Sequence, residues 1–168
     1  QRGLYMRTAL KLALAATAAM LAIGAAQAQD RTIKIGTEGA YPPFNNLTSD
    51  GKLEGFDIDI ANALCEELKA KCEFVTSDWD GIIPALQAGK FDAIIASMSI
   101  TDERKEVVSF SDPYYSSNQA VVTLSATATT MAELAELKLG AQAGTTSFQF
   151  ITDVIKPSSD PYAYNENV

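Results

Sequence analysis

The chain of 168 residues contains no histidine. Histidine is the side chain that most often acts as a general base near neutral pH, and it is the commonest metal ligand in proteins. Without it, neither a Ser-His-Asp triad nor a Cys-His pair can form within this chain. We expect no catalytic site, no metal site and no cofactor.

Long hydrophobic runs are also missing, with one exception near the N-terminus. A basic stretch beginning at Met6 precedes an apolar run of 15 residues, from Leu12 to Ala26, and an Ala-x-Ala pattern closes at Ala28. The run is shorter than the ~20 residues that span a bilayer. The pattern predicts a secretory signal peptide cleaved after Ala28, so that residues 1–28 lie outside the fold of a soluble periplasmic protein. A membrane anchor or a buried helix is the alternative interpretation.

Basic residues are scarce. The chain has 13 Lys and Arg against 21 Asp and Glu, and removal of the signal peptide leaves 10 against 21, a net charge of −11. Such an acidic surface argues against nucleic acid as a partner. It is compatible with the capture of cationic solutes.

Only two cysteines are present, Cys65 and Cys72. In an exported protein such a pair favours a disulfide, and two unrelated buried thiols are the alternative. Seven residues of continuous helix would separate the two Cα atoms by ~10 Å, whereas a disulfide needs less than ~7 Å. If the two cysteines pair, the helix must end between them, near Lys69–Lys71.

The remaining sequence alternates between strand and helix patterns, which predicts an α/β fold with a parallel sheet. Asp50-Gly51 indicates a hairpin turn. Apolar residues at Phe56, Ile60, Leu64 and Leu68 predict the buried stripe of a helix. Further helices are expected over 79–88 and 131–136 and after Gly144, with Pro84 near a first turn, and strands over 31–37, 73–76, 91–96, 120–124, 138–142 and 162–164.

The order of these elements divides the chain into two lobes. One sheet is nearly complete by Tyr115, and a second series of strand and helix has only begun by the last residue. We predict a first lobe over 29–117 and the start of a second lobe over 118–168.

Three polar residues mark the end of the strand predicted over 91–96. Arg104 follows Thr101, a good N-cap, and its planar guanidinium matches a carboxylate. Ser97 and Ser99 are two residues apart, so in a strand both hydroxyls would face the same side. Ligands of open α/β sheets bind beyond the carboxyl ends of the strands. A surface arginine and simple helix capping are the alternatives.

Other candidates follow other strands. Tyr41 and Trp79 could enclose a side chain between two aromatic faces, and Glu38 could pair with a distal cation. Thr146 lies at a helix start after a glycine turn, where free amides favour an anion. Core packing for the aromatics, and solvent exposure for the acid, are the alternatives.

The chain resembles the periplasmic amino-acid-binding proteins of ABC importers, in the branch that binds lysine, arginine, ornithine and histidine. The resemblance runs from about Ile33 to Asn165. It is carried by G-T-E-x-x-Y-P-P-F, G-F-D-I-D-I, C-x6-C, W-D-x-x-I-P-A-L, S-x-S-I-T-x-x-R, F-S-x-P-Y-Y and G-T-T. It implies a type II periplasmic-binding-protein-like fold, with two lobes and a ligand cleft between them. One departure is Ala96, where a serine is common in the family.

The resemblance also implies roles for the candidate residues. Arg104 and the Thr146 backbone would hold the ligand α-carboxylate, and Ser97 and Ser99 would contribute contacts to the α-amino and carboxylate groups. Tyr41 and Trp79 would stack on the ligand side chain. A basic side chain would place its distal charge against Glu38, and Cys65 and Cys72 would form a disulfide.

The resemblance predicts a monomer that captures a basic amino acid and delivers it to an inner-membrane ABC permease complex. It places the α-ammonium-binding aspartate of the family beyond Val168, so we expect an incomplete second lobe. Two alternatives are a dehydratase-type enzyme on the same fold and the sensor domain of a receptor.

Overall fold

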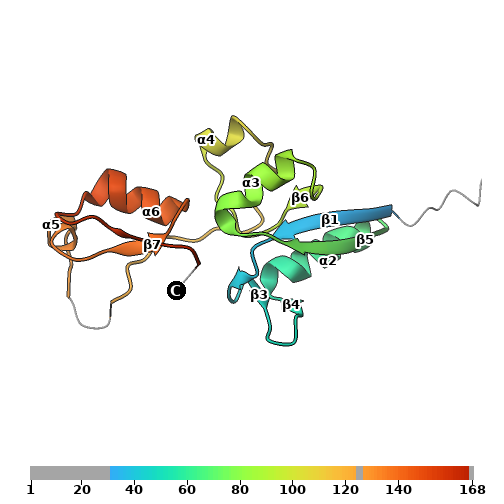
Figure 1. Cartoon of the computed structure of the whole chain (residues 1–168), viewed down its shortest axis with the longest axis horizontal. Coiled ribbons are helices and arrows are strands. Elements are labelled where there is room, and N and C mark those ends of the chain that lie inside the picture. Colours follow the sequence, from blue (N-terminus) through green and yellow to red (C-terminus); the bar gives the residue numbers. More distant parts are fainter. Residues whose placement is uncertain (1–30, 124–126, 167–168) are drawn as a thin grey trace, which may run out of the picture.

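A computed structural model describes residues 31–123 and 127–166, so the predicted signal peptide lies outside the described residues (Figure 1). Two hydrophobic cores organise this part of the chain. The first contains Ile82, Ala85, Phe91 and Ala96. The second contains Leu139, Ile151 and Ile155. No helix in the two described ranges is long and apolar enough to cross a bilayer.

The first core lies against a parallel sheet of three strands in the order β5-β1-β6. These are β1 (Arg31–Thr37), β5 (Ala70–Thr76) and β6 (Ala93–Ile94). The connections run through α2 (Phe56–Glu67) and α3 (Trp79–Gln87). Since the two connections leave in opposite directions along the sheet, right-handed crossovers place these helices on opposite faces, as Figure 1 shows. The predicted parallel α/β arrangement is confirmed.

A small antiparallel sheet follows β1. It contains β2 (Ala40–Tyr41), β3 (Asn45–Leu47) and β4 (Leu53–Glu54). Strands β3 and β4 pair on either side of Asp50-Gly51, which confirms the predicted hairpin turn. Tyr41 is the last residue of β2, which begins three residues after the carboxyl end of β1 at Thr37.

The predicted buried stripe of α2 is wrong. Phe56, Leu64 and Leu68 are 38%, 51% and 55% exposed. The residues of this helix that are buried are Asp57, Ile58, Ala61 and Cys65. Each residue turns the helix by about 100°, so contacts at Asp57 and Cys65 together select a face next to the expected one. Apolar periodicity alone therefore misplaced this helix.

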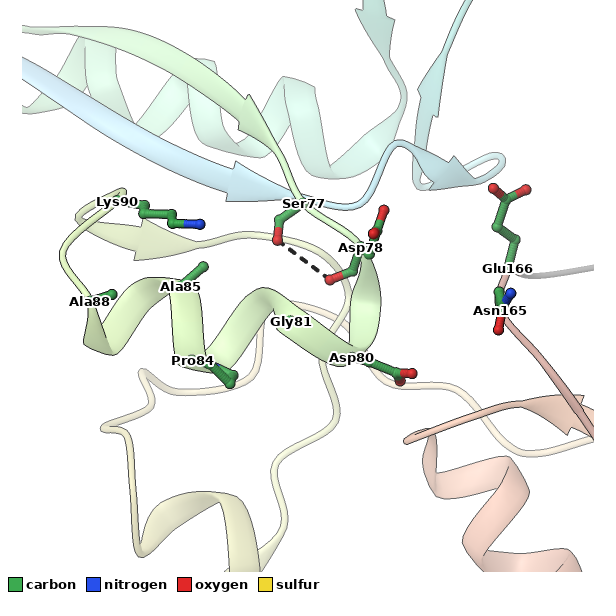
Figure 2. A pocket seen from close by; sticks show the side chains of 10 residues that line it. All are labelled: Ser77, Asp78, Asp80, Gly81, Pro84, Ala85, Ala88, Lys90, Asn165 and Glu166. Carbon is green, nitrogen blue, oxygen red and sulfur yellow. Dashed lines mark hydrogen bonds between the residues drawn. The ribbon is translucent and has the colours of Figure 1, made fainter.

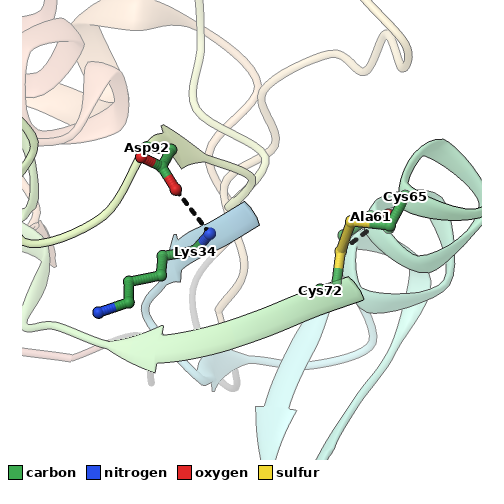
Figure 3. Close-up of a disulfide and its surroundings, with 5 residues drawn as sticks. All are labelled: Lys34, Ala61, Cys65, Cys72 and Asp92. Atoms are coloured by element: carbon green, nitrogen blue, oxygen red, sulfur yellow. Dashed lines mark hydrogen bonds between the residues drawn. A yellow bond between two sulfur atoms is a disulfide. The ribbon is translucent and has the colours of Figure 1, made fainter. Parts of the chain in front are cut away.

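The disulfide between Cys65 and Cys72 is present and joins α2 to β5 (Figure 3). The two Cα atoms lie 5.8 Å apart. Helix α2 ends at Glu67, and Lys69 takes a left-handed conformation with φ of 50° before β5 begins. The helix thus ends between the cysteines, as the distance argument required.

Replacing both cysteines with serine is expected to lower the free energy of unfolding by about 2–4 kcal/mol, because the crosslink restricts the unfolded chain. Urea denaturation with and without a reductant measures the effect. The double variant should be insensitive to the reductant, whereas the parent protein should lose stability. An unchanged parent midpoint under reducing conditions would show that the bridge contributes nothing.

Three details of the sequence prediction need correction. Pro84 lies inside α3 rather than in its first turn, and packing of Ile82 and Ala85 on the core holds this short helix. Strand β6 covers only two of the six residues predicted over 91–96. Residues 120–123 form no strand and are exposed, and Leu124 lies outside the described residues.

The second core is built by short elements over 131–164. The parallel pair of β7 (Gly140–Gln142) and β8 (Tyr162–Tyr164) lies beside helical segments (Figure 1). These segments are α5 (Met131–Ala135), α6 (Thr146–Phe150) and the π-helix η1 (Ile151–Ile155). The helices predicted near Met131 and Gly144 are confirmed.

Candidate functional site

Arg104 lies on α4 (Asp102–Lys105), where the Thr101 hydroxyl caps the helix by accepting the Arg104 amide at 3.2 Å. Arg104 Nη1 donates to the Ser99 carbonyl at 2.8 Å and Nη2 to the Gly144 carbonyl at 2.9 Å. Burial lowers the pKa of Arg104. These contacts favour a site residue over a surface arginine, since Asp102 pairs instead with Lys105.

Trp79 and Gly144 complete this side of the site. The Arg104 guanidinium lies over the Trp79 ring, 5.4 Å from its centre, and Trp79 Nε1 donates to the Gly144 carbonyl at 3.2 Å. Gly144 has φ of 69°, and a Cβ there would lie 3.0 Å from the Asp80 carboxylate and 3.5 Å from the Trp79 ring. One carbonyl oxygen thus joins Trp79 and Arg104, and glycine allows it to approach both.

Ser99 and Thr146 meet from opposite cores, with their hydroxyl oxygens 3.5 Å apart. Gln119, on the segment between α4 and α5, contacts the Thr146 side of this pair. Its side-chain amide donates to the Thr146 hydroxyl at 3.0 Å and accepts from the Ser147 hydroxyl at 2.8 Å. Gln119 was missed from the sequence because its partners lie 27 and 28 residues further along the chain.

Ser97 does not share a direction with Ser99, so the strand argument for the two hydroxyls is wrong. Ser97 lies beyond β6 and has φ of 49°, a left-handed conformation to which strand alternation does not apply. Its hydroxyl donates to the buried carboxylate of Asp57 at 2.9 Å. A ligand contact from Ser97 stays a prediction.

Glu38 follows β1 and accepts a hydrogen bond from the side-chain amide of the buried Gln142. Gln142 also donates to the Asn165 carbonyl at 3.1 Å. Burial raises the pKa of Glu38, the Gln142 hydrogen bond opposes that shift, and Glu166, Asp78 and Asp80 raise the pKa further, because each carries a like charge. Gln142 is a second residue that sequence reasoning missed.

Tyr41 and Trp79 have separate neighbours. Tyr41 is 37% exposed, and its ring packs 5.0 Å from that of Phe44. Trp79 contacts Arg104 and Gly144 instead. An aromatic pair that encloses a ligand side chain stays a prediction.

Two cavities are lined by residues from both parts of the chain. One, of about 650 Å³, is lined by Arg104, Gly144 and Thr146 among others. The other, of about 730 Å³, is lined by Asp78 and Asp80 of the first part of the chain and by Glu166 near its end (Figure 2). Asp78, Asp80 and Glu166 are also the acids whose charges raise the pKa of Glu38, whereas the cavity of Arg104 is lined by other acids, Glu103, Glu106 and Asp153.

The sequence profile of the bacterial extracellular solute-binding proteins, family 3, matches residues 33–164. The chain belongs to this family. An L-arginine-binding protein of Pseudomonas aeruginosa is 44% identical over 133 residues, which cover 78% of this chain and 51% of the relative. ABC transporter arginine-binding protein 1 of Escherichia coli is 40% identical over 143 residues, covering 85% and 58%. The chain thus spans about half the length of these curated relatives.

Solved structures agree with this assignment. A Salmonella typhimurium periplasmic binding protein with high arginine specificity is 42% identical, with a TM-score of 0.74 over 81% of this chain and 61% of the other. An ancestral amino acid-binding protein, a precursor of cyclohexadienyl dehydratase, is 41% identical, with a TM-score of 0.75 over 80% and 61%. The predicted family and its type II two-lobe fold are confirmed, and the related proteins include periplasmic binding proteins.

Proposed function

We propose that this member of the family captures a basic L-amino acid, arginine above all, in the periplasm and delivers it to an ABC permease complex. The observation that carries the proposal is that one short segment contacts two opposite charges: the Gln142 amide donates to Glu38, and the Gly144 carbonyl accepts from Arg104. Arg104 offers a planar donor for a carboxylate, and Glu38 offers a carboxylate for a distal cation. A basic amino acid carries both complementary groups.

The segment 142–146 supports this assignment because it runs along the whole site. Gln142 contacts Glu38 at one end, and Thr146 contacts Ser99 at the other. Gly144 lies between them against Trp79 and Arg104. A ligand held along this segment would be covered by the second lobe while its charged ends contact the first, which suits a capture mechanism in which two lobes close.

The remaining parts of the proposal follow from the sequence and the family. Lobe one over 29–117 and lobe two from 118 fit the two separate cores. Export through cleavage after Ala28 fits the periplasmic binding proteins related to this chain. The functional unit is proposed to be a monomer, and seven residues are proposed to bind the ligand: Glu38, Tyr41, Trp79, Ser97, Ser99, Arg104 and Thr146.

Calorimetric titration of the protein with each of the twenty amino acids tests the proposal. Ornithine is titrated in addition to the twenty. Arginine, lysine and ornithine are expected to bind more tightly than neutral amino acids, because only the basic side chains place a cation near Glu38. The uncharged analogue citrulline is the matched control for arginine. Tighter binding of glutamate or aspartate than of every basic amino acid would contradict the assignment.

A dehydratase activity is a second candidate, favoured by the likeness to a precursor of cyclohexadienyl dehydratase. It would require an acid or a base, and Glu38, whose pKa is raised by burial, is the residue to test. Turnover of prephenate, followed by loss of its absorbance, distinguishes this candidate. Turnover that disappears in Glu38→Gln would favour the enzyme over the binding protein.

A further inference from the structure

Asp57 is a fully buried carboxylate on the second residue of α2. A buried charge is costly unless it is paired or hydrogen-bonded. Among the described residues the one ion pair is that of Lys105 with Asp102, so no cation neutralises Asp57. Neutral donors surround it instead. This buried acid is not among the residues assigned to the ligand, and its burial therefore calls for another role.

The donors come from three separate segments. Asn45 Nδ2 donates to Asp57 at 2.8 Å, and the Asn45 side-chain oxygen accepts the Gly39 amide at 2.8 Å. The Ser97 hydroxyl donates at 2.9 Å. The Tyr114 hydroxyl, from the segment that leads to the second core, donates at 2.8 Å. Each of these segments also carries or precedes a residue of the proposed binding site.

Asp57, Ser97 and Tyr114 form a closed ring of hydrogen bonds. The Ser97 amide donates to the Tyr114 hydroxyl at 3.0 Å, and both hydroxyls donate to the same carboxylate. Burial and the Asp57 charge raise the pKa of Tyr114 to about 12, so this hydroxyl keeps its proton at neutral pH. The ring holds Ser97 at φ of 49°, a conformation that is uncommon for residues other than glycine.

The conformation of Ser97 matters because Ser99, two residues further on, contacts the Arg104 guanidinium. The Ser99 carbonyl accepts from Arg104 Nη1, and the Ser99 hydroxyl lies against Thr146. A change in the backbone at Ser97 would move Ser99, and with it the carbonyl that orients Arg104. Asn45 acts on the part of the site that contains Glu38. Its side-chain oxygen accepts the Gly39 amide and so fixes the chain between Glu38 and Tyr41.

We propose that Asp57 is a positioning residue of the binding site, which acts through Ser97, Tyr114 and Asn45 and does not itself touch the ligand. Together with Asn45, this ring joins the loop after β1 and the loop of Ser97 to the segment of Tyr114, so that the site is preformed before the ligand arrives. This proposal rests on the proposed function, because the residues that it positions are those assigned to the amino acid.

The first test compares Asp57→Asn with Asp59→Asn in the full chain. Both variants remove one acid from the first turn of α2, but Asp59 is exposed. The side chain in Asp57→Asn has one acceptor oxygen in place of two. Its amide N–H group either faces the Ser97 and Tyr114 hydroxyls, which are themselves donors, or leaves these hydroxyls with one acceptor fewer. The affinity of this variant for arginine is expected to fall roughly tenfold or more, the change expected for loss of a hydrogen bond to a charged group. Asp59→Asn should bind like the parent protein.

A second variant keeps the proposal testable if Asp57→Asn fails to fold. Tyr114→Phe retains the aromatic ring at position 114, whose centre lies 6.2 Å from that of Phe56, and removes only the hydroxyl. Hydrogen exchange should then speed up at the Ser97 amide, which loses its acceptor, and arginine should dissociate faster. Tyr115→Phe, at the exposed neighbouring tyrosine, is the matched control and should change neither measurement.

The emission of Trp79, the single tryptophan of the chain, reports on the site in the absence of ligand. It is expected to shift in Asp57→Asn and Tyr114→Phe and to stay constant in both controls. A purely structural role would lower the melting temperature but leave emission and affinity unchanged well below it, and that result would overturn the proposal. If the parent protein binds no basic amino acid, the proposed function fails, and unchanged exchange at Ser97 in Tyr114→Phe would overturn the positioning role separately.

Discussion

Replacing Arg104 with alanine is expected to abolish binding of every amino acid alike, because all of them share the α-carboxylate that the guanidinium would hold. Arg104 is half-buried, and its donors already reach the Ser99 and Gly144 carbonyls, so the group is oriented before a ligand arrives. Loss of one partner of a desolvated charge pair costs about 2–5 kcal/mol of binding free energy. Calorimetric titration with arginine and with glutamine measures both losses.

Two further variants separate this role from a general effect of charge. Lys105→Ala removes the neighbouring cation, whose ion pair with Asp102 is exposed, so the affinity should hardly change. Arg104→Lys keeps the charge but loses the planar fork, and an intermediate affinity is expected. Arginine binding in Arg104→Ala equal to that of the parent protein would return Arg104 to the surface-arginine interpretation.

Replacing Glu38 with glutamine is expected to weaken basic ligands far more than neutral ones. Only a basic side chain loses a charge partner in this variant, and a hydrogen bond to a charged group contributes roughly 1.5–3 kcal/mol. The affinity for arginine should therefore fall roughly tenfold to a hundredfold, while that for glutamine stays nearly constant. Glu66→Gln, at an exposed position of α2, makes the same change of charge without an effect on either ligand.

The raised pKa of Glu38 also predicts how stability depends on pH. A carboxyl whose pKa is higher in the folded state than in the unfolded state binds its proton more tightly when folded. Its ionisation therefore destabilises the ligand-free protein as pH rises from the ordinary value of 4.5 through the raised value. Glu38→Gln should raise the melting temperature at pH 7 and leave it unchanged at pH 4. A lower melting temperature at pH 7 would show that Glu38 stabilises the fold.

Several features were determined by the sequence alone, because each depends on residues that are close in the chain. The pairing of Cys65 with Cys72 required a helix end between them, and Lys69 provides it. The Asp50-Gly51 turn set the β3–β4 hairpin. Thr101 capped the helix of Arg104, as its position before two acids indicated. Alternating strand and helix patterns were enough to establish the α/β class, and short motifs carried the resemblance to the family.

Tertiary structure alone decided which side chains meet. Asp57 lies 40 residues from Ser97 and 57 from Tyr114, so no local pattern marks it as their common acceptor. The same holds for Gln119 with Thr146 and for Gly144 with Trp79. Periodicity also misjudged α2, since a stripe of apolar residues shows that a helix has a buried face but not which of two adjacent faces. Hydrogen bonds to a buried acid and the disulfide made that choice.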